Sequence, residues 1–185
     1  MSYQRFLTEA RSQQEWIVGI RRQLHRFPEL MYEEVKTSQL VCDTLDELGI
    51  AYERIDAGGA HGVTDTAGYL AMNPNGRVPT VEDDGFVLWE SNAIVRYLSA
   101  KHGLGTLCPD DPQRRAEADR WMDWQAATVG AFMRPLTITM FRTQPADRVQ
   151  AIAESQMAEA GRYWAMLDAR LTDSAYVVGD TLTMG

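Results

Sequence analysis

The strongest constraint on the fold is a short β-hairpin pattern that runs directly into a helix. Residues 77–82 and 86–89 have the composition of two short strands, and the Asp83-Asp84-Gly85 sequence between them is typical of a tight hairpin turn. Ser91 follows the second strand closely and is predicted to be the N-cap of a helix. The inward face of that helix is predicted to carry Ile94, Val95 and Leu98. This pattern indicates an α/β unit.

Apolar periodicity predicts five further elements, namely a helix over residues 3–27, a helix over 33–48, a strand over 50–55, a long helix from 112 and a helix over 145–171. Pro28 and Gly49 are predicted to end the first two helices. Residues 103–112 form a linker, in which Asp111 and Pro112 are the N-cap and first residue of the long helix. The sequence therefore predicts a mixed α/β part followed by an all-helical part.

Composition narrows the class of protein. The chain has 185 residues and a net charge of -8, so it repels phosphate backbones and nucleic acid is not an expected partner. It contains no apolar run long enough for a membrane span, and its first residues lack the layout of a secretory signal. Cys42 and Cys108 form no motif with each other, which favours a reducing cytoplasm over a disulfide framework.

Several motifs resemble the glutathione transferase family and occur in the family's order. They are residues 73–81 with the Val78-Pro79 pair, 86–98, 105–109, 118–124 and 176–184. The resemblance covers about residues 43–185. It implies an α/β plus all-α fold, in which a partial thioredoxin-like domain precedes a truncated helical C-terminal domain. Thr183 is then the expected cap of a helix that follows it in the family.

The same resemblance implies a glutathione site. In this family the Val-Pro bond is cis, so Val78 before Pro79 is expected to pair its backbone with the cysteinyl backbone of glutathione, like an added strand. Ser91 and the helix N-terminus are expected to bind the glutamyl carboxylate, and Glu90 to accept hydrogen bonds from the glutamyl ammonium. Arg77 is expected to help hold the tripeptide. The alternatives left open are that Ser91 is only an N-cap, and that Glu90 and Arg77 are solvated surface charges.

The N-terminal region of the chain departs from the family pattern. A glutathione transferase opens with a strand and a loop that carries the Tyr, Ser or Cys addressing the glutathione sulfur, but residues 26–38 show no such strand and loop. Thr37 and Ser38 are the candidate catalytic hydroxyls, and Tyr32 is a further candidate. The hydroxyl or thiol that activates the glutathione sulfur is therefore not identified.

Residues 16–54 resemble a different family, the zinc-dependent aminoacylases and auxin-conjugate amidohydrolases. The match is carried by Trp16, Ile20-Arg21-Arg22, His25-Arg26-Phe27-Pro28-Glu29-Leu30, Glu33-Glu34 and Thr37-Ser38. The two resemblances overlap at residues 45–54, which predicts a hybrid chain. That family's metal ligands lie on segments further downstream, and nothing after Ile55 supplies them, so no metal is expected.

The predicted domains are an amidohydrolase-like helical segment (1–33), a thioredoxin-like glutathione-binding domain without a clear first strand (34–102), a linker (103–111) and a truncated helical domain (112–185). The predicted function is conjugation of glutathione, the substrate, to a small electrophile by a cytoplasmic homodimer. The alternatives are a non-catalytic glutathione-binding or assembly module and an inactive recombined chain. A metal-dependent amidohydrolase ranks last.

Overall fold

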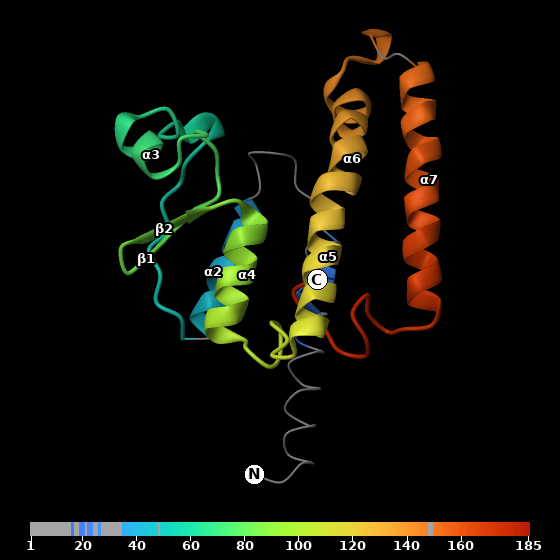
Figure 1. The fold of residues 1–185 in the computed structure, drawn as a ribbon. Helices are drawn as coiled ribbons and strands as arrows, with labels where there is room; N and C mark the ends of the chain where they lie inside the picture. Colours follow the sequence, from blue (N-terminus) through green and yellow to red (C-terminus); the bar gives the residue numbers. More distant parts are fainter. Residues whose placement is uncertain are drawn as a thin grey trace. The chain divides into compact units, whose positions relative to one another are not determined.

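The computed structural model describes residues 35–47, 49–147 and 150–185, together with residues 16, 19, 20, 22, 23 and 26. Most of the predicted helix over residues 3–27, and the candidate Tyr32, lie outside the described residues. The chain divides into two compact units, Met1–Trp89 and Glu90–Gly185. Figure 1 shows their elements coloured in sequence order.

The first unit contains two helices and a hairpin whose bounds are described. They are α2 (Val35–Glu47), a 3-10 turn (Gly59–His61), α3 (Ala67–Met72), β1 (Thr80–Asp83) and β2 (Phe86–Trp89). Helix α2 confirms the predicted second helix, and Gly49 beyond it has a φ of +66°, as expected of a glycine that ends a helix. Helix α3 was not predicted, although Thr66 is its N-cap and accepts a hydrogen bond from the Tyr69 amide.

The predicted hairpin is confirmed. Strands β1 and β2 pair antiparallel, with Thr80 opposite Trp89 and Asp83 opposite Phe86. Asp84 and Gly85 have φ values of 51° and 82°, the positive values that a two-residue turn of this kind requires at both central positions. Strand β1 begins three residues later than predicted, directly after Pro79, which has no N–H to donate to a ladder.

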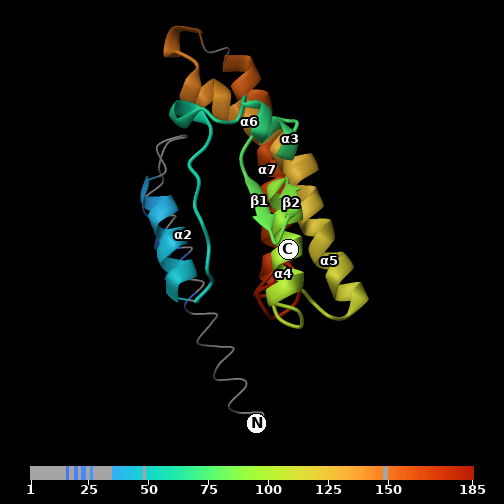
Figure 2. The same ribbon diagram turned by 90° about the vertical axis from the view of Figure 1, so that its left-hand side faces the viewer.

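The predicted strand over residues 50–55 is wrong. Among the described residues the sheet consists of β1 and β2, and no described segment pairs with residues 50–55 as a strand must. The segment instead runs beside α2, where Arg54 Nη1 lies 4.0 Å from Cys42 Sγ (Figure 2). A hydrogen bond with Cys42 raises the pKa of Tyr52 to about 12. The apolar side chain of Ile55 remains 72% exposed.

The second unit is helical. Its elements are α4 (Ser91–His102), α5 (Pro112–Trp124), a π-helical segment (Gln125–Val129), α6 (Gly130–Thr137), a second π-helical segment (Ile138–Arg142), a 3-10 turn (Pro145–Asp147) and α7 (Gln150–Thr172). The predicted start of the long helix is confirmed, because Asp111 Oδ1 accepts from the Arg114 amide at 2.9 Å and Pro112 is the first helical residue. No described helix has the length and hydropathy needed to cross a membrane.

The core of the second unit lies between α6 and α7, which run side by side in Figures 1 and 2. Val129, Phe132 and Ala160 are buried there, and Trp124 and Tyr163 pack against them. The rings of Phe132 and Tyr163 stack with their centres 5.2 Å apart, and Trp124 meets Tyr163 edge to face at 6.1 Å. This aromatic packing joins the two helices.

The last residues of the chain pack onto the helical unit. Val178 is fully buried, and the Met184 amide donates to the Leu107 carbonyl at 2.8 Å. Arg170 Nε donates to the Val177 carbonyl at 2.9 Å. The amide of Gly185 donates to Thr183 Oγ1 at 3.3 Å, which is the contact expected of a capping side chain.

Candidate functional site

In the first unit, two buried side chains hold the loop that leads into β1. Asn73 is 2% exposed, and its Nδ2 donates to the Arg77 carbonyl at 2.7 Å and to Thr80 Oγ1 at 3.1 Å. The Tyr69 hydroxyl donates to the same Arg77 carbonyl at 2.8 Å. Because Tyr69 lies on α3 and Asn73 directly follows it, the helix fixes the position of the loop.

Val78 lies at the exposed end of this loop. Its side chain is 48% exposed, and its peptide bond to Pro79 is cis, as the family resemblance implies. None of the hydrogen bonds of the described residues uses the N–H or the C=O of Val78. Backbone groups of this kind are strong donors and acceptors, so Val78 offers both to an extended peptide.

Arg77 is exposed, and its guanidinium makes no ion pair within the described first unit. Its carbonyl, by contrast, accepts from both Tyr69 and Asn73. The sequence prediction expected Arg77 to help hold the tripeptide, and the structure also gives its backbone carbonyl a role in fixing the loop. Tyr69 and Asn73 were missed as site-forming residues. The Asn-Pro-Asn-Gly turn was a signal for Asn73, but no local pattern marks Tyr69.

In the second unit, the start of α4 differs from the prediction. The prediction that Ser91 is the N-cap is wrong, because Glu90 occupies that position and Ser91 is the first helical residue. Glu90 has a φ of 72° and a ψ of 113°, a conformation that costs a non-glycine residue on the order of 1–3 kcal/mol. Strain of this kind persists where the surrounding structure enforces it, and it is frequent at ligand sites.

The exposed Ser91 hydroxyl makes no hydrogen bond within the described residues, so it does not cap the helix. The Glu90 side chain makes no cap hydrogen bond either. The amides of the first helical turn lack intrahelical partners and carry a partial positive charge. This helix start therefore combines free donors with a nearby carboxylate, a pair suited to a zwitterionic amino-acid group.

Helix α4 is anchored on α5 by a polar cluster. Arg96 donates from Nε to Asp119 Oδ1 at 2.6 Å and from its terminal nitrogen to Asp123. The carboxylates of Asp123 and Asp119 raise the pKa of Arg96 above its already high ordinary value. Asn92 Nδ2 donates to the Met122 carbonyl at 3.1 Å. These contacts fix the first turns of α4, including the position of Ser91.

The candidate catalytic hydroxyls lie on a different element. Thr37 and Ser38 are half-buried in the first turn of α2. Their assignment to the glutathione sulfur stays a prediction. Among the described residues, no group of three or more His, Cys, Asp or Glu side chains is arranged to hold a metal ion.

Comparisons with known proteins point to one family. Residues 39–100 match the family described as glutathione S-transferase, N-terminal domain, a range that includes Val78, Glu90 and Ser91. Glutathione S-transferase GstB of Escherichia coli K12 is 44% identical over 144 residues, which are 77% of this chain and 69% of GstB. Glutathione S-transferase F9 of Arabidopsis thaliana is 32% identical over 151 residues, covering 76% of this chain and 67% of that protein.

Solved structures give the same result. The theta class glutathione S-transferase of Xanthomonas axonopodis pv. citri, crystallised with glutathione bound, superposes with a TM-score of 0.68 at 44% identity. The superposition covers 76% of this chain and 67% of that one. The chain therefore belongs to the glutathione S-transferase family. Its fold is that of the family, a thioredoxin-like N-terminal domain with a small sheet and a helical C-terminal domain.

Proposed function

We propose that this chain binds reduced glutathione through Arg77, Val78, Pro79, Glu90 and Ser91. The observation that carries the proposal is Val78, whose backbone N–H and C=O have no partner within the described residues. They are suited to pair with the cysteinyl backbone of glutathione as an added strand would. Ser91 and the α4 amides would bind the glutamyl carboxylate, and Glu90 the glutamyl ammonium.

We further propose that the bound glutathione is conjugated to a small electrophile. The thiol loses its proton, the thiolate sulfur attacks an electrophilic carbon, and a carbon–sulfur bond forms. The electron pair leaves with a departing group such as chloride, or moves onto an acceptor atom conjugated to that carbon. A hydroxyl donor near the sulfur would stabilise the thiolate, and Ser38 and Thr37 are the candidates for that role.

A glutathione titration by calorimetry, using the full chain, tests the binding site. Saturable binding is expected, and Ser91→Ala should weaken it. Absence of binding to a folded chain contradicts the site.

Turnover is a separate test with 1-chloro-2,4-dinitrobenzene, in which the thiolate displaces chloride. Ser38→Ala and Thr37→Ala distinguish the two hydroxyls, and binding without turnover favours the alternative of a non-catalytic glutathione-binding module.

The proposed active form is a homodimer. Three large apolar side chains at seven-residue spacing along α7 support it, since Met157, Trp164 and Leu171 are 58%, 45% and 42% exposed. This spacing is typical of helices that pack against another helix. Sedimentation of the wild-type chain beside Trp164→Glu tests the proposal: the wild type should sediment as a dimer and the variant as a monomer. A monomeric wild type contradicts it.

Two further parts of the proposal concern the cellular location of the protein and the character of its N-terminal segment. Cys42 and Cys108 are free, which supports a cytoplasmic location. We also propose that the front of the chain is amidohydrolase-like, on the resemblance of residues 16–54. The glutathione S-transferase match begins at residue 39, so this proposal chiefly concerns the residues before it. Metal analysis of the purified chain tests whether that segment binds a metal ion.

A further inference from the structure

The second unit contains a groove that uses none of the residues proposed for glutathione. Its volume is about 380 Å³, within the range of small-molecule sites, and it is open to solvent. One wall comes from the first π-helical segment and α6, with Ala127, Thr128, Ala131 and Phe132. Gln156, Glu159 and Tyr163 of α7 form the other wall. π-Helical segments widen a helix locally and are frequent at functional sites.

The polar residues that line this groove are Thr128, Gln156, Glu159 and Tyr163, and Glu159 is the charged one among them. Glu159 supplies a carboxylate that is half-exposed, and no Lys or Arg is among the lining residues. Gln156 Oε1 is buried and has no hydrogen-bond donor within the described residues. A buried acceptor in this condition carries an unfavourable free energy that a donor would relieve. The terminal torsion of a glutamine is soft, so Oε1 can turn toward a donor in the groove.

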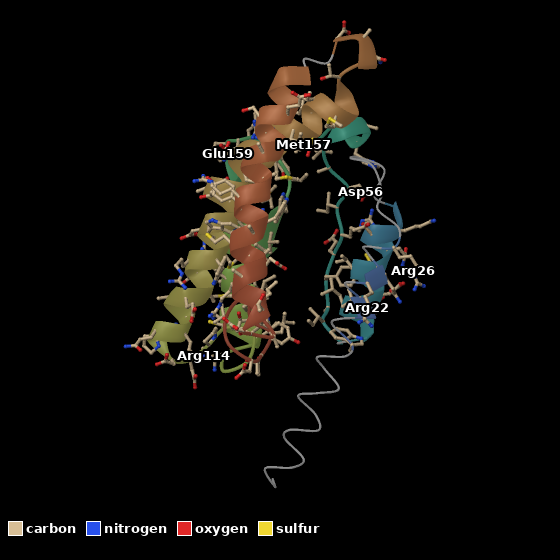
Figure 3. All side chains as sticks on the ribbon, turned by 90° about the vertical axis from the view of Figure 1, so that its right-hand side faces the viewer. Arg22, Arg26, Asp56, Arg114, Met157 and Glu159 are labelled. Atoms are coloured by element: carbon tan, nitrogen blue, oxygen red, sulfur yellow. The ribbon has the colours of Figure 1, made fainter. Side chains whose placement is uncertain are left out.

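A cation already lies at the edge of the groove. The guanidinium carbon of Arg162 is 4.5 Å from the centre of the Tyr163 ring, and its nitrogen is 3.8 Å from Glu159 Oε1. The Arg162 side chain is 70% exposed, so its ion pair with Glu159 is weak, and its Nη2 also donates to the Tyr163 hydroxyl at 2.6 Å. Its position shows that Tyr163 and Glu159 together stabilise a positive group. On α7, Figure 3 labels Glu159 close to Met157, and Tyr163 follows Glu159 by four residues, about one helical turn.

We propose that this groove binds a small organic ammonium ion with an apolar or aromatic body. The ammonium donates to Glu159 and to Gln156 Oε1, and its body lies against Ala127, Ala131 and the edge of Phe132. The site is independent of glutathione and goes beyond the proposed transferase function.

The test compares two probes with the same phenylethyl body and opposite charge, 2-phenylethylammonium and 3-phenylpropanoate. Ligand-observed NMR titrations use the full chain without glutathione. The ammonium should bind and the carboxylate should not. Glu159→Gln should weaken the ammonium about tenfold or more, because it removes a charged acceptor. The matched control is Asp168→Asn, which neutralises an exposed acid on α7 outside the groove and should change nothing.

Two further variants separate binding in the groove from a general charge effect. Ala131→Leu, at an exposed position, fills the groove and should abolish binding without disturbing the core. Arg162→Ala removes the competing cation and should strengthen binding about two- to fivefold. Equal binding of both probes, or ammonium binding that survives Ala131→Leu, overturns the proposal. Glutathione binding is measured separately and should be unchanged in all these variants, so failure of one site is distinguishable from failure of the other.

Discussion

The first unit and the second unit differ in how many apolar side chains they bury. Among the described residues, Tyr69 is the one buried apolar side chain of the first unit. The second unit buries a larger set, comprising Ile94, Cys108, Ala118, Met122, Val129, Phe132, Ala160 and Val178. Burial of apolar surface is the main stabilising contribution to a fold. The described part of the first unit therefore depends on hydrogen bonds around Asn73 and Tyr69, whereas the second depends on packing.

The proposed glutathione-binding residues are therefore held in position by different kinds of contact in the two units. Val78 is held by a loop whose position depends on a few polar contacts. Ser91 starts a helix anchored by Arg96 on α5. Segments with few buried apolar contacts open locally at lower free energy than packed cores. Glutathione should therefore stabilise the first unit more than the second, since a ligand stabilises the state to which it binds.

The largest expected effect comes from the core of the second unit. Phe132 is 5% exposed and stacks on Tyr163, so Phe132→Ala should lower the free energy of unfolding by about 3–5 kcal/mol. Urea unfolding followed by tryptophan fluorescence measures this. The matched control is Phe86→Ala in β2, where the side chain is 49% exposed and the cost should be below about 1.5 kcal/mol. Equal costs in the two variants contradict the difference between the units.

The next effect concerns binding. Ser91→Ala should weaken glutathione by about 1.5–3 kcal/mol, the contribution of a hydrogen bond to a charged group, and should leave the unfolding free energy almost unchanged. Stability is spared because the Ser91 hydroxyl has no partner within the described residues. Ser174→Ala is the control, since its hydroxyl donates to the Gly179 carbonyl in the C-terminal loop. If Ser91→Ala lowers the unfolding free energy but leaves the glutathione affinity unchanged, Ser91 is a structural residue and not a binding residue.

The third effect tests the polar support of the first unit. Asn73→Ala removes the donor to Arg77 and Thr80 and should cost about 1–3 kcal/mol locally. Hydrogen exchange should rise in residues 73–89 and stay unchanged in α5 to α7, and glutathione affinity should fall. Asn75→Ala is the control, because its backbone amide still donates to Asn73 Oδ1. Faster exchange across both units contradicts a local role for Asn73.

The parts of the fold predicted correctly are those decided by local backbone chemistry. Asp84 and Gly85 tolerate the positive φ of a tight turn, and Asp111 before Pro112 satisfies the rules for a helix start. The start of α4 was misplaced by one residue. Ser is preferred over Glu as an N-cap, and residue preferences do not reveal that the chain holds Glu90 at a positive φ.

The parts missed depend on contacts between different elements, which the periodicity of the sequence does not reveal. The contacts of Tyr69 with Arg77 and Thr80 join a helix to a loop, and no periodicity marks them. The groove likewise depends on α7 lying beside α6. Of the candidate glutathione residues, the motif order identified Val78 and Ser91, while the exposure and free hydrogen-bonding groups that support them come from the fold.

The smallest expected effect examines the strand that the sequence predicted and the structure lacks. Ile55 is 72% exposed, so Ile55→Thr should change the unfolding free energy by less than about 0.5 kcal/mol. If residues 50–55 instead form a packed strand in solution, the same change removes buried apolar surface and should cost roughly 1–2 kcal/mol. Urea unfolding distinguishes the two. A large cost would mean that the first unit packs residues 50–55 against further structure, and its apolar core would then be closer in size to that of the second unit.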